Sequence, residues 1–279
     1  MISSNPKVGK STFSRAMSVS IAKGIPFLNR KVKEGEVLYL ALEENLDQIK
    51  QSFRKLGVNA STPLGIYGGR PWPNLSEQLE FLIMTRKPSL VVIDTVLRLA
   101  DGKVQINEYN SASKWLNPYM YMAHESGSAI CLLYHNRKSS GDSVSGNLLE
   151  LIGSQAISAT IDQLISLRKQ PDGKRSFSTE GRFTDVPETV YQLDGNTLNL
   201  IEIGSSQELK SEDLESRIID LLESKGEMGQ NRIQKTISGR EQTILHALNT
   251  LVQQGTINKS GSGKSSTPFQ YSLSSTLRD

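Results

Sequence analysis

The sequence predicts an α/β fold with a mainly parallel β-sheet, followed by a smaller C-terminal domain. Apolar, β-branched segments such as 36–42 and 88–94 alternate with segments of helical periodicity, and this order is typical of a parallel sheet covered by helices. Residues 4–12 (SNPKVGKST) have the form of a phosphate-binding loop that opens a helix. With 279 residues, the chain is long enough for one large and one small domain.

Composition and charge narrow the classes of function. The chain has 37% hydrophobic and 22% charged residues, and no apolar run approaches the ~20 residues that a membrane-spanning helix needs, so no membrane partner is predicted. The only cysteine, Cys131, lies in an apolar run and cannot form an internal disulfide, which fits a cytoplasmic protein, as does the lack of an apolar signal segment. A net charge of +3 permits a nucleic-acid partner without requiring one.

The segment 4–12 carries the strongest chemical signal. In such a loop, backbone N–H groups surround an anion at a helix N-terminus, where the helix dipole favours negative charge. The ammonium group of Lys10 would reach the β- and γ-phosphates of a nucleotide, and the hydroxyl group of Ser11 would ligate Mg²⁺. The predicted nucleotide-binding residues are Ser4, Asn5, Pro6, Lys7, Val8, Gly9, Lys10, Ser11 and Thr12.

Two features depart from the full motif. Ser4 stands where the motif has its first glycine, and that position often requires a positive φ, which glycine adopts most easily. Only three residues precede Ser4, whereas the loop should follow a buried β-strand. We expect either a longer native gene product or a sheet that lacks this strand. Taken alone, the motif is also compatible with a mobile N-terminal tail, so the rest of the sequence must decide.

Two acidic residues are predicted at the same edge of the sheet as the loop. The buried strand 36–42 is followed by Glu43, and the buried strand 88–94 ends in Asp94. Because the chemistry of parallel sheets lies at the carboxyl ends of the strands, both side chains are expected beside the phosphate loop, where Asp94 would hold the water shell of Mg²⁺. An acidic residue after a strand can also be a simple cap.

The intervening segments predict helices over 13–23, 45–56 and 75–86 and a short strand over 64–67.

A histidine completes this edge. A helix over 109–126 precedes the buried strand 128–134, which is followed by His135. A histidine at a strand end is often structural, but its position on this edge, close to Arg137 and Lys138, favours a functional role. Further along, the sequence predicts a Gly/Ser-rich loop over 139–150, a short helix from 153, a strand over 161–168, and hairpin turns at 171–173 and 194–196.

In order and spacing, five segments of the first 203 residues resemble the RecA-like ATPase core of RepA-type plasmid replicative helicases and their phage and mobile-element relatives. These belong to the same class as DnaB-type hexameric helicases. The five segments are PKVGKST, VLYLALEE with Glu43, SLVVIDT with Asp94, LLYHNRK with His135, and EGRFTDVPE with Arg182. The resemblance implies ATP and Mg²⁺ as ligands, DNA as a partner, and a homo-oligomeric ring such as a hexamer.

The resemblance also implies roles for single residues. Glu43 would polarise the attacking water, Asp94 would be the second Mg²⁺ site, and His135 would sense the γ-phosphate. Arg182 would be the finger that reaches a neighbour's nucleotide, with Arg168 as the alternative, because a guanidinium group there stabilises the charge that develops during phosphoryl transfer. Either arginine is equally compatible with a solvated charge on a hairpin.

The segment 139–147 resembles a central-pore loop that tracks single-stranded DNA. It holds Asp142 but no basic or aromatic residue, so backbone groups and the flanking Arg137 and Lys138 would have to hold the phosphates.

The C-terminal part is predicted to be a separate module. We expect 1–203 to form the ATPase domain, 204–211 a linker, and 212–279 a small domain whose first helix is capped by Ser211. Its other elements are helices over 230–237 and 240–254 and strands over 256–259 and 268–273. Three helices and a hairpin resemble a winged helix.

Basic residues of this module are candidates for DNA contact. Lys259 and Lys264 of the wing would lie against phosphates, while Arg240 would enter a groove with Gln242 and Thr243. The Gly-Lys-Ser triplet around Lys264 joins two strands, so it is not a second phosphate loop. Winged helices also dock proteins, and the third helix carries one arginine near its start, so protein docking stays open.

The leading hypothesis is an ATP- and Mg²⁺-dependent DNA motor, a RepA-like hexameric helicase that hydrolyses ATP at subunit interfaces. One alternative is a RecA-like ATPase that regulates or loads other factors without unwinding DNA. The other is a non-catalytic winged-helix protein that binds DNA or a partner, in which the altered loop has abolished turnover.

Overall fold

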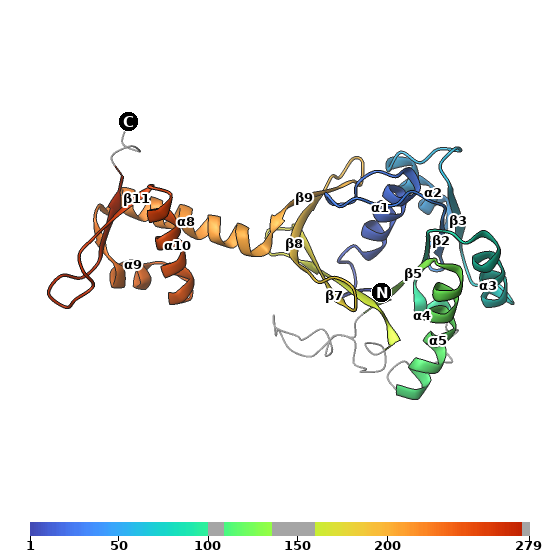
Figure 1. Ribbon diagram of the computed structural model, residues 1–279. Helices are drawn as coiled ribbons and strands as arrows, with labels where there is room; N and C mark the ends of the chain where they lie inside the picture. Colours follow the sequence, from blue (N-terminus) through green and yellow to red (C-terminus); the bar gives the residue numbers. More distant parts are fainter. Residues whose placement is uncertain (100–108, 136–159, 275–279) are drawn as a thin grey trace. The chain divides into compact units, whose positions relative to one another are not determined.

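The computed structural model describes residues 1–99, 109–135 and 160–274. The chain divides into two compact units, Met1–Gly204 and Ser205–Asp279, which are described separately below (Figure 1). No helix among the described residues is long and apolar enough to span a membrane.

In the described part of the first unit, nine strands form one sheet with the order β3-β2-β4-β5-β1-β6-β7-β8-β9. Every pairing from β3 to β6 is parallel, whereas β7 pairs antiparallel with both β6 and β8. The fold is therefore α/β with a mainly parallel, RecA-like sheet, which confirms the predicted class. The strands are β1 (Ile2–Ser4), β2 (Val37–Ala41), β3 (Leu64–Gly68), β4 (Leu90–Asp94), β5 (Ala129–His135), β6 (Gln163–Lys169), β7 (Arg175–Gly181), β8 (Val186–Leu193) and β9 (Leu200–Ser205).

Helices cover both faces of this sheet because alternate strand residues point to opposite sides. Tyr39 of β2 packs with Phe13 and Phe53 on one face, whereas Leu40 packs with Leu79 and Leu116 on the other. The first face carries α1 (Lys10–Lys23) and α2 (Leu46–Lys55), and the second carries α3 (Leu75–Arg86) and α5 (Tyr109–Ser126); the short α4 (Val96–Leu99) follows β4 (Figure 1).

The strand that precedes the phosphate loop is present. Although β1 has only three residues, it lies between β5 and β6 and pairs with both, and its Ile2 is fully buried. The expectation that the sheet might lack this strand is therefore wrong. Pairing on both sides stabilises a strand that is too short to be read from sequence.

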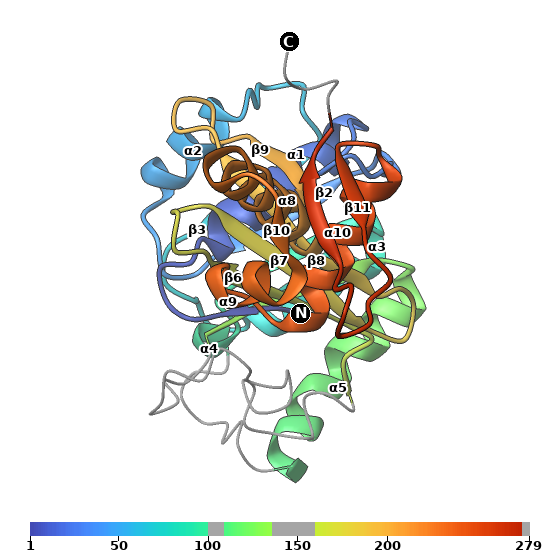
Figure 2. The same cartoon turned by 90° about the vertical axis from the view of Figure 1, so that its left-hand side faces the viewer.

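Among its described residues, 205–274, the second unit has three helices and a three-stranded sheet with the order β10-β12-β11. Both pairings of this sheet are antiparallel (Figure 2). Ile218, Ile233, Leu248 and Tyr271 are fully buried in its core. The elements are α8 (Ser206–Lys225), β10 (Met228–Gly229), α9 (Gln230–Thr236), α10 (Glu241–Gln253), β11 (Ile257–Ser260) and β12 (Gln270–Leu273).

The predicted linker over 204–211 is instead the end of β9, through Ser205, and the first turns of α8. Helix α8 follows β9 directly, because Ser205 and Glu208 form a capping box: the Ser205 hydroxyl accepts from the Glu208 N–H, and the Glu208 carboxylate accepts from the Ser205 N–H. The predicted cap, Ser211, lies inside the helix and donates to Glu215 at 3.0 Å. The sequence contains the S-x-x-E signal, but the small residues around it are also typical of a linker.

Candidate functional site

The phosphate loop connects β1 to α1 and turns through two left-handed residues, Lys7 (φ 64°) and Gly9 (φ 109°). Ser4 is the last residue of the extended strand β1, so it does not need the positive φ that was expected at the first glycine of the motif. Instead, the Ser4 hydroxyl donates to the carbonyl oxygen of Asn5 at 2.8 Å. The substitution of serine for glycine therefore causes no backbone strain in this loop.

Lys10 is enclosed by the loop and has only 4% of its surface exposed. Its ammonium group lies 3.1 Å from the carbonyl oxygen of Ser4, 3.3 Å from that of Asn5, and 2.9 Å from Nδ1 of His135. Burial lowers the pKa of Lys10 to about 8, against the opposing attraction of Asp94 and Glu43. Lys10 is thus buried among polar groups, and the negative charges of Asp94 and Glu43 attract its ammonium group.

The register of the sheet brings these side chains to one edge. Asp94 pairs with Ala41, two residues before Glu43, and His135 pairs with Ser4 at the start of the loop. Burial and the nearby Lys10 charge lower the pKa of His135, while Glu43 and Asp94 oppose this shift. The structure therefore brings together Glu43, Asp94, His135 and Lys10, which come from the ends of three strands and the start of α1.

Asp94 is held by a buried hydrogen-bond network. The Tyr39 hydroxyl donates to Oδ2 of Asp94 at 3.1 Å and lies 3.0 Å from the hydroxyl of Ser14. Burial raises the pKa of Asp94, whereas the neighbouring Ser11 hydroxyl, Arg15 and Tyr39 lower it. The Ser11 hydroxyl and the Asp94 carboxylate thus lie close together at the first turn of α1.

Arg15 supports this network from α1. It is 6% exposed, pairs with the carboxylate of Glu44, and donates to the Ser52 hydroxyl at 3.2 Å. Its guanidinium carbon lies 5.9 Å from the centre of the Tyr39 ring. No motif of the sequence marks Arg15 or Tyr39, because Tyr39 lies in an otherwise apolar strand and Arg15 lies in an ordinary helix.

Glu43 is oriented by residues that follow β4. Its Oε1 accepts from the Thr95 hydroxyl at 3.0 Å and from Nε of Arg98 at 3.2 Å. The carboxylate is partly exposed, with 39% of the side-chain surface accessible. It is therefore fixed in direction while water can still reach it.

Comparisons with known proteins cover the part of the chain that holds these residues. Residues 1–141 match a protein family described as an AAA domain, and this stretch includes the phosphate loop, Glu43, Asp94 and His135. The chain belongs to this AAA domain family. A solved structure of a DnaB-like replicative helicase, described with its interactions with primase, is similar with a TM-score of 0.56 and 12% identity. The match covers 72% of this chain and 57% of that chain, so the likeness shows the fold alone. No curated protein matches the chain.

Arg175, which no motif of the sequence marks, contacts the phosphate loop. Its Nε donates to the carbonyl oxygen of Val8 at 2.7 Å, and a Cβ atom added to Gly9 would lie 3.2 Å from the same nitrogen. Arg175 begins β7 and pairs with Lys169, so the turn between β6 and β7 lies at the loop edge of the sheet. No local signal predicts a contact between residues 167 positions apart.

Arg182 lies at the opposite edge of the sheet from the phosphate loop. It follows Gly181, which pairs with Gln163 at the start of β6, whereas Lys10 follows the carboxyl end of β1. Its guanidinium group pairs with Asp162 at 3.3 Å. The structure therefore does not bring Arg182 and Lys10 of one chain together. The alternative, Arg168, lies near the loop edge, 3.8 Å from Glu188.

The structure describes only some of the predicted DNA-contact residues. Arg137, Lys138 and the segment 139–147 lie outside the described residues. In the second unit, Arg240 is the exposed N-cap residue of α10, and Lys264 is exposed in the turn between β11 and β12. The ammonium group of Lys259 lies 3.8 Å from the centre of the Phe269 ring, so it is already engaged in a cation–π contact.

Proposed function

We propose that this chain is a cytoplasmic ATP-hydrolysing DNA motor, a RepA-like replicative helicase that assembles as a homo-oligomeric ring such as a hexamer. The observation that carries the proposal is the convergence of Lys10, Ser11, Glu43, Asp94 and His135 at one edge of the sheet. An amine can hold the phosphates, a hydroxyl and a carboxylate can hold Mg²⁺, and a second carboxylate can orient the attacking water. The imidazole adds a possible hydrogen-bond donor for the γ-phosphate.

The donor set fits Mg²⁺. No cluster of three or more metal-ligating side chains is found among the described residues, which suits an ion that is held by one or two protein oxygens together with phosphates and water. The Ser11 hydroxyl and the buried Asp94 carboxylate would hold this ion, and Tyr39 would keep the carboxylate in place. When bound, Mg²⁺ would neutralise charge on the β- and γ-phosphates.

Glu43 and His135 have complementary roles in the proposal. The Glu43 carboxylate, oriented by Thr95 and Arg98, would accept a hydrogen bond from the attacking water. A protonated Lys10 can only donate, so Nδ1 of His135 accepts and the proton of the neutral ring lies on Nε2. That N–H would donate to the γ-phosphate and report its presence.

We assign the finger that completes a neighbour's site to Arg182, with Arg168 as the alternative. Arg182 lies away from the Lys10 of its own chain, so a finger role for it would require action on another subunit's nucleotide. A mixture of Lys10→Ala and Arg182→Ala chains tests this assignment. Each variant alone should be inactive, and the mixture should recover activity because some interfaces then combine an intact loop with an intact finger. Without recovery, the finger role fails, and the same experiment applies to Arg168.

We further propose that the second unit is a winged helix that contacts DNA. Its element order, three antiparallel strands and exposed turn between β11 and β12 support this assignment. Lys264 at the turn and Arg240 at the start of α10 would meet phosphates and bases, while Lys259 contributes from β11. Lys264→Ala should weaken DNA binding and reduce its salt dependence by about one charge. Unchanged binding would favour protein docking instead.

Steady-state ATP hydrolysis, measured with and without single-stranded DNA, tests the proposed function. A motor hydrolyses ATP and is stimulated by DNA. Hydrolysis without stimulation would favour a RecA-like regulatory or loading ATPase, whereas the lack of any hydrolysis would favour a non-catalytic binding protein. DNA unwinding itself requires a strand-displacement assay.

A further inference from the structure

Helix α10 of the second unit exposes a row of uncharged side chains that can donate and accept hydrogen bonds. Their spacing of four, three and four residues places them on one face of the helix, opposite the face that is buried in the core. The row consists of Gln242, His246, Asn249 and Gln253. In α10, which is described throughout, only Glu241 is an Asp, Glu, Lys or Arg residue. The row therefore extends far beyond Gln242, the residue that was expected to enter a groove.

The charges of the second unit are separated by element. Helix α8 carries six acidic and three basic residues. Over 226–274, which the structure describes without a gap, two residues are acidic and five are basic. The five basic residues are all exposed: Arg232, Lys235, Arg240, Lys259 and Lys264. Within this unit, α9 and the turn between β11 and β12 lie below α8 (Figure 1 and Figure 2), so basic elements share one side. A positive side of this kind attracts a polyanion.

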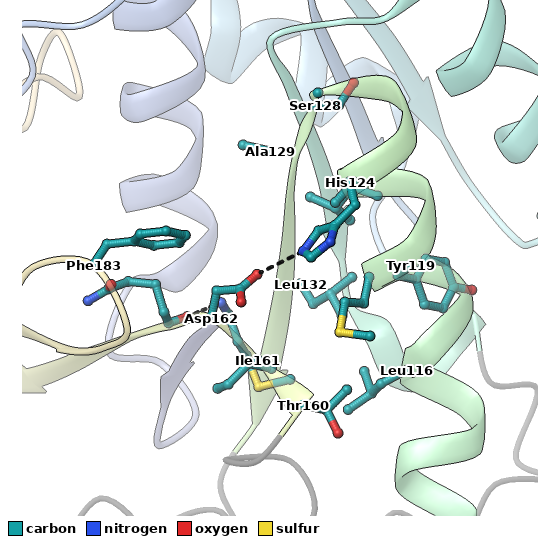
Figure 3. Close-up of a pocket in the computed structure, with 16 residues that line it drawn as sticks. Leu116, Tyr119, His124, Ser128, Ala129, Leu132, Thr160, Ile161, Asp162 and Phe183 are labelled. Atoms are coloured by element: carbon teal, nitrogen blue, oxygen red, sulfur yellow. Dashed lines mark hydrogen bonds and ion pairs between the residues drawn. The ribbon is translucent and has the colours of Figure 1, made fainter.

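The second unit offers little to a protein partner. The centre of a protein interface usually holds an exposed aromatic or aliphatic anchor. Among the residues that the structure describes, the large apolar side chains that are exposed all belong to the first unit. One of them, Phe183, lies beside a cleft of that unit (Figure 3). The uncharged row and the basic residues around it therefore favour a nucleic acid over a protein.

Helices α9 and α10 form a helix-turn-helix. The four residues 237–240 join the two helices. Arg217 of α8 donates to the carbonyl oxygen of Ser238 at 3.3 Å and so holds this turn against the first helix of the unit. In this motif the second helix lies in the major groove of a duplex, and the first helix crosses the phosphate backbone. Arg232 and Lys235 of α9 would then meet phosphates, while the row on α10 would face the base edges.

The absence of charge from the row of α10 points to base recognition. Contacts of lysine and arginine with phosphates strengthen binding to every sequence, because all sequences carry the same backbone charge. An amide gains little from that charge. It loses free energy when it leaves water without a matching partner, and it regains that free energy only where a base offers the right donor and acceptor. A row of amides thus discriminates between sequences.

We propose that the second unit recognises a specific duplex sequence through the major groove, with adenine bases at the positions that face Gln242 and Asn249. The carbonyl oxygen of a side-chain amide accepts from N6 of adenine, and the amide N–H donates to N7. The row from 242 to 249 spans about 10 Å, the length of about three base pairs. The two adenines should therefore lie about three base pairs apart, with His246 at the bases between them. The proposal rests on the winged helix proposed above and is independent of ATP hydrolysis.

The test selects duplexes from a random library with the full chain, in an excess of single-stranded DNA that occupies other DNA sites of the protein. We expect a recovered motif with two adenines about three base pairs apart, bound at least about 100-fold more tightly than an unrelated duplex. Asn249→Ala should weaken binding to the selected duplex at least about fivefold and remove the preference for adenine at one position. Its affinity for an unrelated duplex should stay within about twofold. The matched control is Gln207→Ala, an exposed amide of α8, which should change neither.

A modified base tests the assigned contact itself. The analogue 7-deazaadenine keeps its pairing with thymine but lacks the N7 acceptor in the major groove. At the position assigned to Asn249, it should weaken binding of the original chain several-fold and have no further effect on Asn249→Ala. A further loss in the variant would overturn the assignment.

Two other results would overturn the proposal in distinguishable ways. If the chain bound all duplexes alike, base recognition would be wrong, but the proposed phosphate contacts, tested by Lys264→Ala, would stand. If the chain bound no duplex at all, the proposed DNA contact of the winged helix would fail as well, and protein docking would be favoured. Neither result would bear on ATP hydrolysis by the first unit.

Discussion

The titration of Lys10 predicts how nucleotide affinity depends on pH. Lys10 is buried, and its pKa is lowered to about 8. Bound phosphates would raise this pKa again, because negative charge favours the ammonium form. The free chain must therefore take up a proton on Lys10 in order to bind a nucleotide tightly at high pH. For a free pKa of about 8, the protonated fraction is about 90% at pH 7 and about 10% at pH 9.

The dissociation constant for ADP should therefore increase about tenfold between pH 7 and pH 9, which corresponds to ~1.4 kcal/mol. Calorimetric titration at several pH values measures this increase and the accompanying proton uptake. The matched control is Lys10→Arg, because the guanidinium group of arginine stays charged between pH 7 and pH 9. The affinity of this variant for ADP should be lower than that of the original chain but should not change with pH. A flat profile for the original chain, or an equal slope for both chains, would refute the assigned role of the Lys10 ammonium group.

Three further substitutions test the supporting contacts. Tyr39→Phe removes a buried hydrogen-bond donor from Asp94. It should lower the unfolding free energy of the first unit by ~1–2 kcal/mol in urea titrations and raise the Mg²⁺ concentration for half-maximal hydrolysis several-fold. An unchanged Mg²⁺ requirement would contradict this reasoning. Arg175→Ala should weaken ADP binding about tenfold, whereas Lys169→Ala should not; equal effects would exclude a specific contact with the loop. Ser205→Ala should destabilise the second unit by ~1 kcal/mol in thermal melts, with Ser211→Ala as a near-neutral control.

Much of the sheet could be predicted because its central strands are buried on both faces. Such strands appear in the sequence as continuous apolar runs, which predict β2, β4 and β5. The polar residue at the end of each run then marks the carboxyl end of the strand. Parallel strands then place their carboxyl ends at one edge, which is why Glu43 and Asp94 were expected beside Lys10. That reasoning needs only local patterns and one rule of topology.

Other features depend on contacts that no local pattern contains. Arg175 reaches Val8 only because an antiparallel strand follows β6 and returns its first residue to the loop edge. The same register carries Arg182 to the opposite edge. Strand β1 gives no periodic signal because it has only three residues, although two neighbouring strands stabilise it. The start of α8 carries a capping signal in Ser205 and Glu208, but the glycine and serine residues around it are equally typical of linkers.

The central claim is that the groups around Lys10 form one site for ATP hydrolysis, and the variant Glu43→Gln tests it most directly. This change keeps the size of the side chain but removes the charge that would polarise the attacking water. Single-turnover hydrolysis and ADP binding should be measured on the same samples. The account predicts a rate at least about 100-fold below that of the original chain, with ADP affinity unchanged within about threefold. Hydrolysis at the original rate in the variant, or its absence in the original chain, would contradict the account.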